Sequence, residues 1–481
     1  MKKPSGFYSS LGLLILLNAI IKPVWIFAID RQVQNVVGIE TYGIYFSLLG
    51  LSVVFSFLAD WGFTGFFNRQ LAASEENFFR LPGKFLLLKL LFALLYGLVI
   101  FIAAWLSGVK RWDILFYVVL IQIFTSLFVF LRAIITAQQW FKTDAWLSIA
   151  DKGLMIITCG ILLWFPLLAG SITLERFLFL QTASLAIATI LAFIFLVKKG
   201  VHFSIPKKWL PDRKLLAQAL PFGITVLLMS MHARLDAFLL ERMNTNGPYQ
   251  AGIYAAAYRL LDASNMAGYL VVSFMLPFIA RRWSKQEEIT TVIHNCRHFL
   301  LMLATGIIIT IVSLAPWIQR VLYHHNDVNA IEVLRWCLPA LAGYSLVQIY
   351  GTVLTATGRI MDFFFINLGC VVVNIVLNLI LIPAWGAKGC CIAAISSQFL
   401  CGIATMLYVK QKMGVSLHIR SLLIYIFTAI LLSGFFYLCK DWPVGKWMLI
   451  IVAMMITVAV MLTSKLAGLS QWIGSWKKQN G

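Results

Sequence analysis

The chain has 481 residues, of which 61% are hydrophobic and 12% are charged, and its formal net charge is +20 at pH 7. A soluble globular protein carries about twice that share of charged residues, so the composition excludes the soluble class and indicates an integral membrane protein. The basic residues are divided among short connections rather than gathered on one soluble face, which argues against a nucleic-acid-binding protein.

Apolar blocks of about 20 residues recur along the chain, which is the length that an α-helix needs to cross the hydrocarbon core. The first block continues beyond the apolar core of a signal peptide and lacks a small-residue cleavage site, so it is interpreted as the first span. The pattern of alternating strands that is typical of a membrane β-barrel does not occur. Fourteen spans are predicted, near residues 11–34, 43–63, 85–107, 114–135, 148–168, 174–197, 215–241, 250–279, 298–318, 331–355, 361–383, 387–409, 420–439 and 445–464.

Basic residues are concentrated in the even-numbered connections between these spans and in the C-terminal tail. About 23 Lys and Arg lie on that side against about eight on the other, and this bias predicts that both termini are cytoplasmic. The side assigned to the cytoplasm includes Arg69, Arg80, Lys84, Lys198, Lys199, Lys207, Lys208, Arg213, Lys214, Arg281, Arg282, Lys285, Lys410, Lys412, Lys477 and Lys478.

Short sequence matches recur at nearly constant spacing in the two halves of the chain. GIY occurs at residues 43–45 and again at 252–254, Asp30 is matched by Asp236, and Thr136 is matched by Thr355. Because each half holds an even number of spans, the halves enter the membrane in the same direction, which is the plan of parallel transporter repeats. The predicted organisation is an N-terminal lobe at 1–197, a basic cytoplasmic linker at 198–214, a C-terminal lobe at 215–412, and a final helix pair with the tail at 413–481.

Charged side chains occur inside the predicted spans. Each costs about 3 kcal/mol at mid-bilayer by insertion scales, so they are predicted to face a protein interior or a watery cavity. Helical spacing supports shared polar faces, with Tyr254, Tyr258, Asp262 and Asn265 forming one stripe and Ser52, Ser56 and Asp60 another. Pro23 is expected to kink the first span. The charged residues are Lys22, Asp30, Arg31, Lys89, Arg132, Asp151, Lys152, Arg234, Asp236, Arg259, Asp262 and Arg335.

The sign of this interior charge favours an anionic ligand, because about eight basic residues stand against roughly five acidic ones within the spans. Structural ion pairing is the alternative. Arg259 and Asp262 are three residues apart on a helix and can meet, whereas Arg234 and Asp236 point in different directions and need other partners. Two other residue sets are interpreted as packing residues: the asparagine stripe Asn367, Asn374 and Asn378, and the eight cysteines, which lie mostly in apolar blocks.

Sequence motifs for catalysis do not occur in the chain. The patterns GxxxxGK[ST], HExxH, CxxC and GxSxG are absent. The predicted loops are too short to fold as a catalytic domain. The chain is therefore predicted not to be an enzyme, with no catalytic residues, no cofactor and no metal site.

Three longer stretches resemble the polysaccharide-specific flippases of the MOP superfamily, and the likeness is greatest to Wzx-type flippases of O-antigen and capsule synthesis. They are YGIYFSLLGLSVVFSFLADWG, LPFGITVLLMSMHARLDAFLLERM and LTATGRIMDFFFINLGCVVVNIVLNLILIPAWGAKGCCIA. The resemblance implies two lobes around a central cavity lined by spans one, two, seven and eight. It also implies transfer of an undecaprenyl-pyrophosphate-linked oligosaccharide across the bacterial inner membrane.

On this interpretation the basic and polar residues of the cavity bind the pyrophosphate and glycan, and its carboxylates couple transport to an ion. The substrate-binding candidates are Lys22, Arg31, Arg132, Arg234, Tyr258, Arg259 and Asn265. The ion-coupling candidates are Asp30, Asp60, Asp236 and Asp262.

The expected partners are the lipid-linked oligosaccharide, membrane lipid, and the glycan polymerase and glycosyltransferases of the same synthesis, but not nucleic acid. A monomer is expected because one chain contains both lobes. Two alternatives stay open. A drug or cation exporter of the same superfamily would need an acidic cavity, and a non-directional scramblase or assembly scaffold would need its interior charges only as structural pairs.

Overall fold

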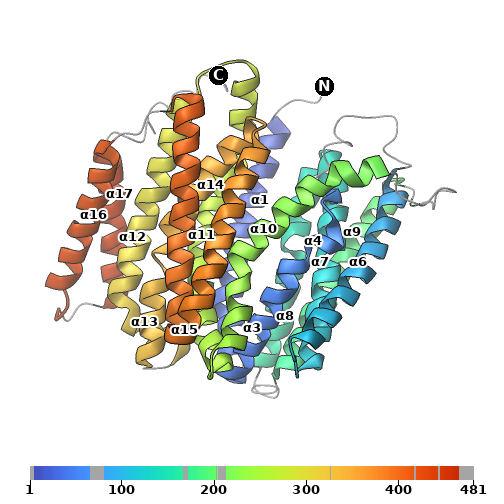
Figure 1. The fold of residues 1–481 in the computed structure, drawn as a ribbon, viewed down its shortest axis with the longest axis horizontal. Coiled ribbons are helices and arrows are strands. Elements are labelled where there is room, and N and C mark those ends of the chain that lie inside the picture. Colours follow the sequence, from blue (N-terminus) through green and yellow to red (C-terminus); the bar gives the residue numbers. More distant parts are fainter. Residues whose placement is uncertain are drawn as a thin grey trace. The chain divides into compact units, whose positions relative to one another are not determined.

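The computed structural model describes residues 5–64, 81–165, 172–201, 203, 213–324, 327–415, 419–442 and 445–464. Within these ranges the regular structure is helical, with no β-strand (Figure 1). The chain forms two compact units, Met1–Ala255 and Ala256–Gly481. The prediction of an all-α membrane protein is confirmed.

The first unit is built around two long contacts between helices that are distant in sequence. One is between α1 and α8, and the other is between α3 and α10. Helices α7 and α9 also pack together, and α8 packs on α9. Its elements are α1 (Ser5–Val24), η1 (Trp25–Asp30), α2 (Arg31–Val37), α3 (Ile39–Phe55), α4 (Phe57–Asp60), α6 (Leu81–Leu106), α7 (Trp112–Ala137), α8 (Phe141–Trp164), α9 (Leu174–Lys198), α10 (Arg213–Met243) and the first turns of α11 (Gly247–Ser284).

The second unit is centred on α12 and α14. Helix α12 contacts α13, α14, α16 and α17, and α14 packs along α15. Tyr350 of α14 is fully buried in an apolar cluster to which α11, α12 and α15 also contribute. Beyond the rest of α11, the elements are α12 (Thr290–Tyr323), α13 (Val328–Cys337), α14 (Ala340–Ala356), α15 (Ile360–Met413), α16 (Ile419–Leu438) and α17 (Lys446–Thr463).

Twelve helices in the described ranges are long and apolar enough to cross a membrane. The apolar α3 is shorter, with 17 residues. Helix α15 has 54 residues and would measure about 80 Å if straight, far more than the hydrocarbon core of about 30 Å. It is two helices joined at Gly386, whose φ of 55° and ψ of −132° are not helical. With α3 and the second arm of α15, the described spans number the predicted fourteen.

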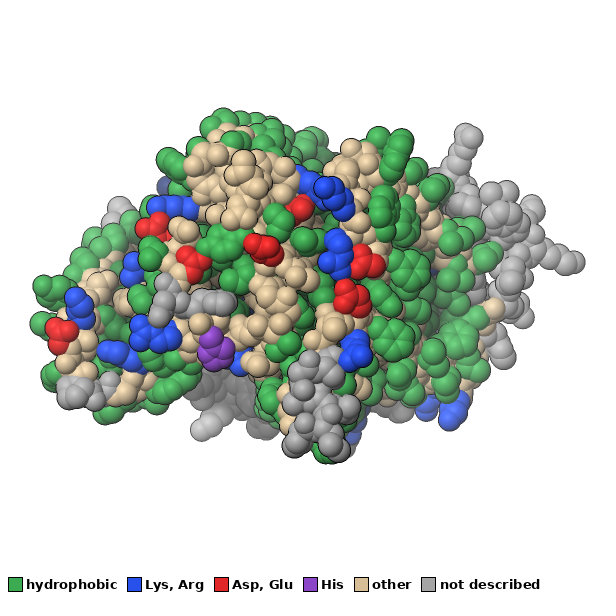
Figure 2. All heavy atoms as spheres, turned by 90° about the horizontal axis from the view of Figure 1, so that it is seen from below, with side chains coloured by type: hydrophobic (Ala, Val, Ile, Leu, Met, Phe, Trp, Pro, Cys, Tyr) green, Lys and Arg blue, Asp and Glu red, His purple; other side chains and the backbone are tan. Residues whose placement is uncertain are grey.

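Large hydrophobic side chains cover the outward faces of helices in both units. Leu94, Leu106, Tyr437 and Leu438 are 71–79% exposed. In a soluble protein such contiguous surface would be a site of association, whereas in a bilayer it contacts lipid. Seen from below the view of Figure 1, charged side chains of both signs lie among broad hydrophobic areas (Figure 2).

The predicted lobes are separated by the linker 198–214, whereas the two compact units of the structure are separated at Ala255. The units divide inside α11, because α10 packs on α3. The lobes were predicted from repeats and topology, and that organisation stays a prediction. Most of the linker 198–214 lies outside the described residues, as do Arg69, Arg80 and the tail 465–481. All eight cysteines are free, and seven of them are buried, in agreement with their interpretation as packing residues.

Candidate functional site

The first membrane helix is interrupted shortly after Pro23. Helix α1 ends at Val24, residues Trp25–Asp30 form the π-helix η1, and α2 then begins at Arg31. Proline removes one backbone donor and crowds the preceding turn, so a regular helix is disturbed at this point. Single π-helical turns within α-helices are frequent at functional sites. The π-helical segment begins two residues after Pro23, Asp30 is its last residue, and Arg31 begins α2. The kink expected at Pro23 stays a prediction.

Asp30 is buried and Arg31 is half-buried. The Tyr42 hydroxyl donates a hydrogen bond to Oδ2 of Asp30 at 2.8 Å. Nη2 of Arg31 donates to Oε1 of the neighbouring Gln32 at 3.1 Å. Both residues therefore lie in the interior of the first unit rather than on a lipid-facing surface, as their charge requires.

Basic and acidic side chains come together where α1 and α7 approach α8, and this group is called the cationic cluster. It consists of Lys22, Arg132, Asp144, Asp151 and Lys152. Arg132 of α7 makes a bidentate ion pair with Asp144 of α8, with Nε–Oδ1 at 2.7 Å and Nη2–Oδ2 at 3.0 Å. About two turns further along α8, Lys152 pairs with Asp151 at 3.3 Å.

The first membrane helix contributes Lys22 and Trp25 to this region. The ammonium group of Lys152 lies 4.8 Å from the ring centre of Trp25, a cation–π contact. Lys22 is an exposed side chain of α1 and interacts electrostatically with Arg132, Asp151 and Lys152. The cluster therefore holds three cations and two carboxylates, which leaves an excess of one positive charge in the described structure.

The cationic cluster has the chemistry of a phosphate site. Guanidinium groups bind phosphate oxygens in pairs, and ammonium groups bind them as point charges. Nearby, Nδ2 of Asn18 donates to Oγ of Ser148 at 2.7 Å and joins α1 to α8. The exposed Lys22 can reach a ligand while Arg132 and Lys152 are held in place by their carboxylates.

A second ion pair lies apart from this cluster, at the end of α4. Nζ of Lys89 is 2.5 Å from Oδ1 of Asp60 and 2.9 Å from both the carbonyl oxygen and the hydroxyl of Ser126. The Thr64 hydroxyl also donates to Asp60. Lys89 is only 1% exposed, so these oxygen atoms provide most of its solvation. The ion-coupling role of Asp60 stays a prediction, because a resident ammonium group occupies its carboxylate here.

The repeated GIY segments contact each other directly within the first unit. A Cβ atom on Gly43 would collide with the backbone of Pro248 and Gly252, and one on Gly252 would collide with Ile39. The Gln34 side chain donates to the carbonyl oxygen of Gly252 at 3.0 Å. Only glycine permits this backbone approach, and the contact between these segments is called the glycine contact.

Arg234 and Asp236 lie on α10 beside the glycine contact. A Cβ atom on Gly50 would lie 2.6 Å from the carbonyl oxygen of Arg234. Asp236 is buried and accepts a hydrogen bond from the Tyr254 hydroxyl at 3.3 Å. Asp236 thus resembles Asp30, since each of these two buried carboxylates accepts a hydrogen bond from a tyrosine hydroxyl further along the chain.

The polar stripe on α11 lies largely inside the second unit. The Tyr258 hydroxyl is 3.4 Å from that of Tyr344, and Nε2 of Gln348 donates to Oδ1 of Asn265 at 3.1 Å. Tyr258 and Asn265 are buried, whereas Arg259 and Asp262 are half-buried. The contacts of Tyr258 and Asn265 with α14 are those of packing residues, and their substrate-binding role stays a prediction.

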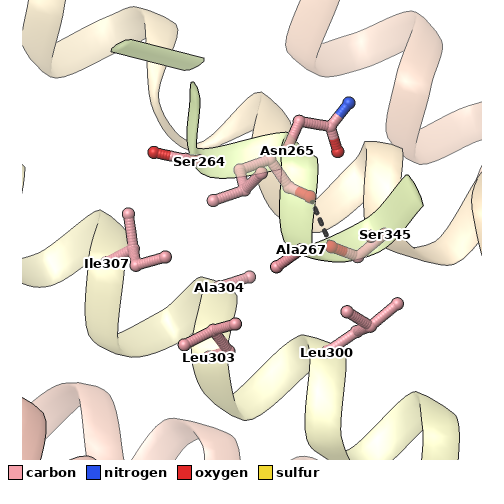
Figure 3. Close-up of a pocket in the computed structure, with 10 residues that line it drawn as sticks. Ser264, Asn265, Ala267, Leu300, Leu303, Ala304, Ile307 and Ser345 are labelled. Atoms are coloured by element: carbon pink, nitrogen blue, oxygen red, sulfur yellow. Dashed lines mark hydrogen bonds between the residues drawn. The ribbon is translucent and has the colours of Figure 1, made fainter. Parts of the chain in front are cut away.

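A small pocket lies beside Asn265, between α11, α12 and α14 (Figure 3). Its walls are mainly apolar, with Leu300, Leu303 and Ile307 contributed by α12. The Ser345 hydroxyl is already hydrogen-bonded to the carbonyl oxygen of Leu341 at 2.8 Å. The pocket therefore offers little polar recognition for a charged ligand.

The asparagine stripe lies between the two arms of α15. Nδ2 of Asn374 donates to Oγ of Ser397 at 3.0 Å, and Nδ2 of Asn378 donates back to the Asn374 carbonyl oxygen at 3.0 Å. The first of these hydrogen bonds crosses between the two arms, as expected of interhelical packing, and the second lies within the first arm.

The sequence did not indicate the roles of three residues, which are Asp144, Trp25 and Arg297. Asp144 and Trp25 were not selected because their roles depend on a helix neighbour that is distant in sequence. Arg297 was placed just outside the ninth span, but α12 begins at Thr290 and includes it. The charge had ended the apolar run in the sequence, although the helix itself continues. Among the described residues, no group of three or more His, Cys, Asp and Glu could hold a metal ion.

The comparisons with known proteins identify both a sequence family and a fold. A family described as "Polysaccharide biosynthesis protein" matches residues 8–283. None of the curated protein sequences compared with the chain matches it.

Solved structures of membrane transporters superpose on most of the chain. The lipid II flippase MurJ in an inward closed conformation is 12% identical with a TM-score of 0.65, covering 97% of this chain and 99% of its own. A MOP superfamily transporter from Pyrococcus furiosus, whose binding pocket is described as having reverse polarity, is 12% identical with a TM-score of 0.60, covering 86% and 96%. An outward-facing MATE family multidrug resistance transporter is 12% identical with a TM-score of 0.54, covering 84% and 93%. At this identity the likeness establishes the MOP superfamily fold.

Proposed function

The chain belongs to the polysaccharide biosynthesis protein family, and we propose that it is a flippase for an oligosaccharide linked to undecaprenyl pyrophosphate. The cargo moves from the cytoplasmic to the periplasmic leaflet of the bacterial inner membrane, for the synthesis of O-antigen, capsule or another exported glycan. Both termini of the flippase are cytoplasmic, and the chain works as a monomer beside the glycosyltransferases and the glycan polymerase.

The observation that carries this proposal is the excess positive charge of the cationic cluster, whose basic residues lie on helices long and apolar enough to cross a membrane. A cation in the bilayer is retained only if something offsets its cost, and a pyrophosphate does so when it binds. Lys22 supplies an exposed ammonium group, and Arg132 supplies the guanidinium that suits phosphate. Arg31, Arg234 and Arg259 provide further positive charge along the path of the cargo.

Transfer follows an alternating-access cycle, in which the binding region opens to one side of the membrane at a time. The glycine contact joins spans of the two sequence repeats, so it must separate at one stage of this cycle. Asp30 and Asp236, each held by a tyrosine hydroxyl, are the candidates for binding a coupling ion as the contact changes.

A drug or cation exporter is the alternative that the MATE likeness raises. An exporter of cationic cargo needs a binding region with an excess of carboxylates. In the cationic cluster the basic side chains exceed the acidic ones, so this alternative is disfavoured.

The test is a flipping assay in proteoliposomes with a fluorescent undecaprenyl-pyrophosphate oligosaccharide. We expect Lys22→Gln and Arg259→Gln to insert normally and to lower the transfer rate about tenfold or more, because a charge-assisted hydrogen bond contributes about 1.5–3 kcal/mol. Lys142→Gln is the matched control, since Lys142 is an exposed cation at the start of α8 and lies outside the cluster. Wild-type rates in both test variants would overturn the proposal.

A further inference from the structure

Arg297 is a buried cation that the proposed transport path does not use. It lies on α12, two turns from the start of the helix, and is 5% exposed. Its Nη1 donates to the Tyr350 hydroxyl on α14 at 3.1 Å. The Tyr425 hydroxyl on α16 also interacts electrostatically with the guanidinium group. Arg297 therefore joins three helices of the second unit.

The surroundings of Arg297 hold more hydrogen-bond donors than acceptors. A guanidinium group has five N–H donors and no acceptor. The Nε atom of Arg297 is buried without a hydrogen-bond partner. Because Tyr350 accepts from Arg297 through its oxygen, its own O–H remains available to donate. The next residue, His298, is bonded to Tyr425 at 3.4 Å and to the Ser464 hydroxyl at 2.9 Å, so it supplies no anion either.

This environment differs from that of Lys89, which is the other buried Lys or Arg among the described residues, and from that of the half-buried Arg132. Lys89 is paired with Asp60, and Arg132 is paired with Asp144. For Arg297 the described residues supply hydroxyl groups but no carboxylate partner. Hydroxyl groups solvate a cation without cancelling its charge, and burying an uncompensated charge is costly. An anion from outside the chain would remove that cost.

The position of Arg297 along the helices indicates where such an anion comes from. Tyr350 lies in the last turns of α14, Tyr425 in the first turns of α16, and Ser464 directly after α17. Basic residues are concentrated at the same helix ends. The positive-inside pattern assigns these ends to the cytoplasmic leaflet. The basic residues are Arg281, Arg282, Lys410, Lys412 and Arg420. Basic pockets between helices on that side bind the phosphate groups of anionic lipids.

We propose that Arg297, Tyr350 and Tyr425 form a binding site for the phosphate of an anionic phospholipid headgroup, at the junction of α12, α14 and α16. The guanidinium Nε–H and the tyrosine hydroxyls donate to the phosphate oxygens. The His298 contacts with Tyr425 and Ser464 connect α17 to the same site. Lipid bound there holds the final helix pair against α12, and the site is separate from the cationic cluster.

The experiment measures lipid binding by the intact protein purified in a neutral detergent. Native mass spectrometry and thermal unfolding are recorded after adding phosphatidylglycerol, phosphatidylcholine or inorganic phosphate. We expect phosphatidylglycerol to be retained and to raise the unfolding temperature, and the two other additions to do neither. Arg297→Met should weaken phosphatidylglycerol retention about tenfold or more, as expected for the loss of a charged donor to phosphate.

Two further variants control for the loss of a surface charge and for misfolding. Arg420→Gln removes an exposed arginine at the same helix end and should retain phosphatidylglycerol as the wild type does. Arg297→Met should unfold in neutral detergent at the wild-type temperature or above, because it removes an uncompensated charge. If it does not fold, Tyr425→Phe provides the test, since it removes one donor and keeps the cation.

Three results would overturn the proposal. They are wild-type retention of phosphatidylglycerol by Arg297→Met, an equal loss in Arg420→Gln, and stabilisation by inorganic phosphate that matches that by the lipid. The last result would assign the site to free phosphate. None of these readouts depends on transport, so they are independent of the proposed flippase activity.

Discussion

At the scale of single residues, the buried Lys89 and the half-buried Arg132 are each compensated by oxygen atoms of neighbouring helices. Lys89 is surrounded by Asp60 and Ser126, and Arg132 is held by both oxygens of Asp144. Such pairs cost desolvation energy on both sides, so their presence is weak evidence for stability alone. A role in positioning the cation explains such pairs better, because a paired guanidinium group is fixed in place and still has further N–H donors for a ligand.

The Arg132–Asp144 pair leads to a stability prediction. Arg132→Gln should destabilise the protein by about 3 kcal/mol, because Asp144 is left buried without its counter-charge. The side chain of Arg132 is 24% exposed, so the effect belongs at the lower end of the range for buried pairs. Thermal unfolding in detergent measures it, and Arg132→Gln with Asp144→Asn should recover most of the loss.

Transport by the same variants separates the two interpretations of this pair. If Arg132 binds pyrophosphate, the double variant is stable and still slow in the flipping assay. A double variant with wild-type transport would show that the pair is structural, as the scaffold alternative requires.

At the scale of helices, departures from regular geometry lie close to the residues of interest. The π-helix η1 ends at Asp30, and α3 is interrupted before the short α4 that carries Asp60. Trp61 follows α4 with a φ of 49°, a left-handed conformation that is uncommon outside glycine. Interrupted helices in transporters direct backbone groups toward ligands, and these two interruptions lie on the first two spans.

The glycine contact leads to a prediction about helix separation. Gly43→Ala places a methyl group where the backbone of Pro248 and Gly252 lies, so α3 and the start of α11 must move apart. Ser47 lies one turn along α3 and is fully buried. We expect a cysteine introduced by Ser47→Cys to react with a water-soluble maleimide severalfold faster in the Gly43→Ala background.

The control for this experiment is Gly369→Ala, because a Cβ atom at Gly369 meets no other atom within 4 Å. The native cysteines are mostly buried, and the protein without Ser47→Cys measures their contribution. Equal labelling in the Gly43→Ala and Gly369→Ala backgrounds would contradict the prediction.

At the scale of the whole molecule, the driving force for the proposed transport follows from charge. Moving an anion out of a negative interior is favourable by about 2.3 kcal/mol per charge for each 100 mV of membrane potential. The potential alone can therefore bias outward transfer of a pyrophosphate cargo. The carboxylate of Asp60 holds the ammonium of Lys89. The coupling roles of Asp30, Asp60, Asp236 and Asp262 all stay predictions.

This energy balance predicts how the flipping rate responds to ion gradients in proteoliposomes. Collapsing the pH gradient alone should leave the initial rate close to its starting value, because the electrical term remains. Collapsing the potential at constant pH should slow it severalfold. Loss of transport with the pH gradient alone would instead indicate obligatory proton antiport, and Asp30→Asn and Asp236→Asn would then be tested for the same loss.

The sequence by itself determined the membrane class, the all-α fold and the number of spans, because hydropathy and helix length are local properties that a bilayer constrains strongly. It also located Pro23 and four of the five charged residues of the cationic cluster, but not Asp144. The duplicated halves stay a prediction. Only the tertiary structure decided which charges meet: Arg132 with Asp144, Lys89 with Asp60, and Arg297 with two tyrosines. These partners lie 12 to 128 positions apart in the chain, so no local pattern relates them, and their pairing depends on how the helices pack.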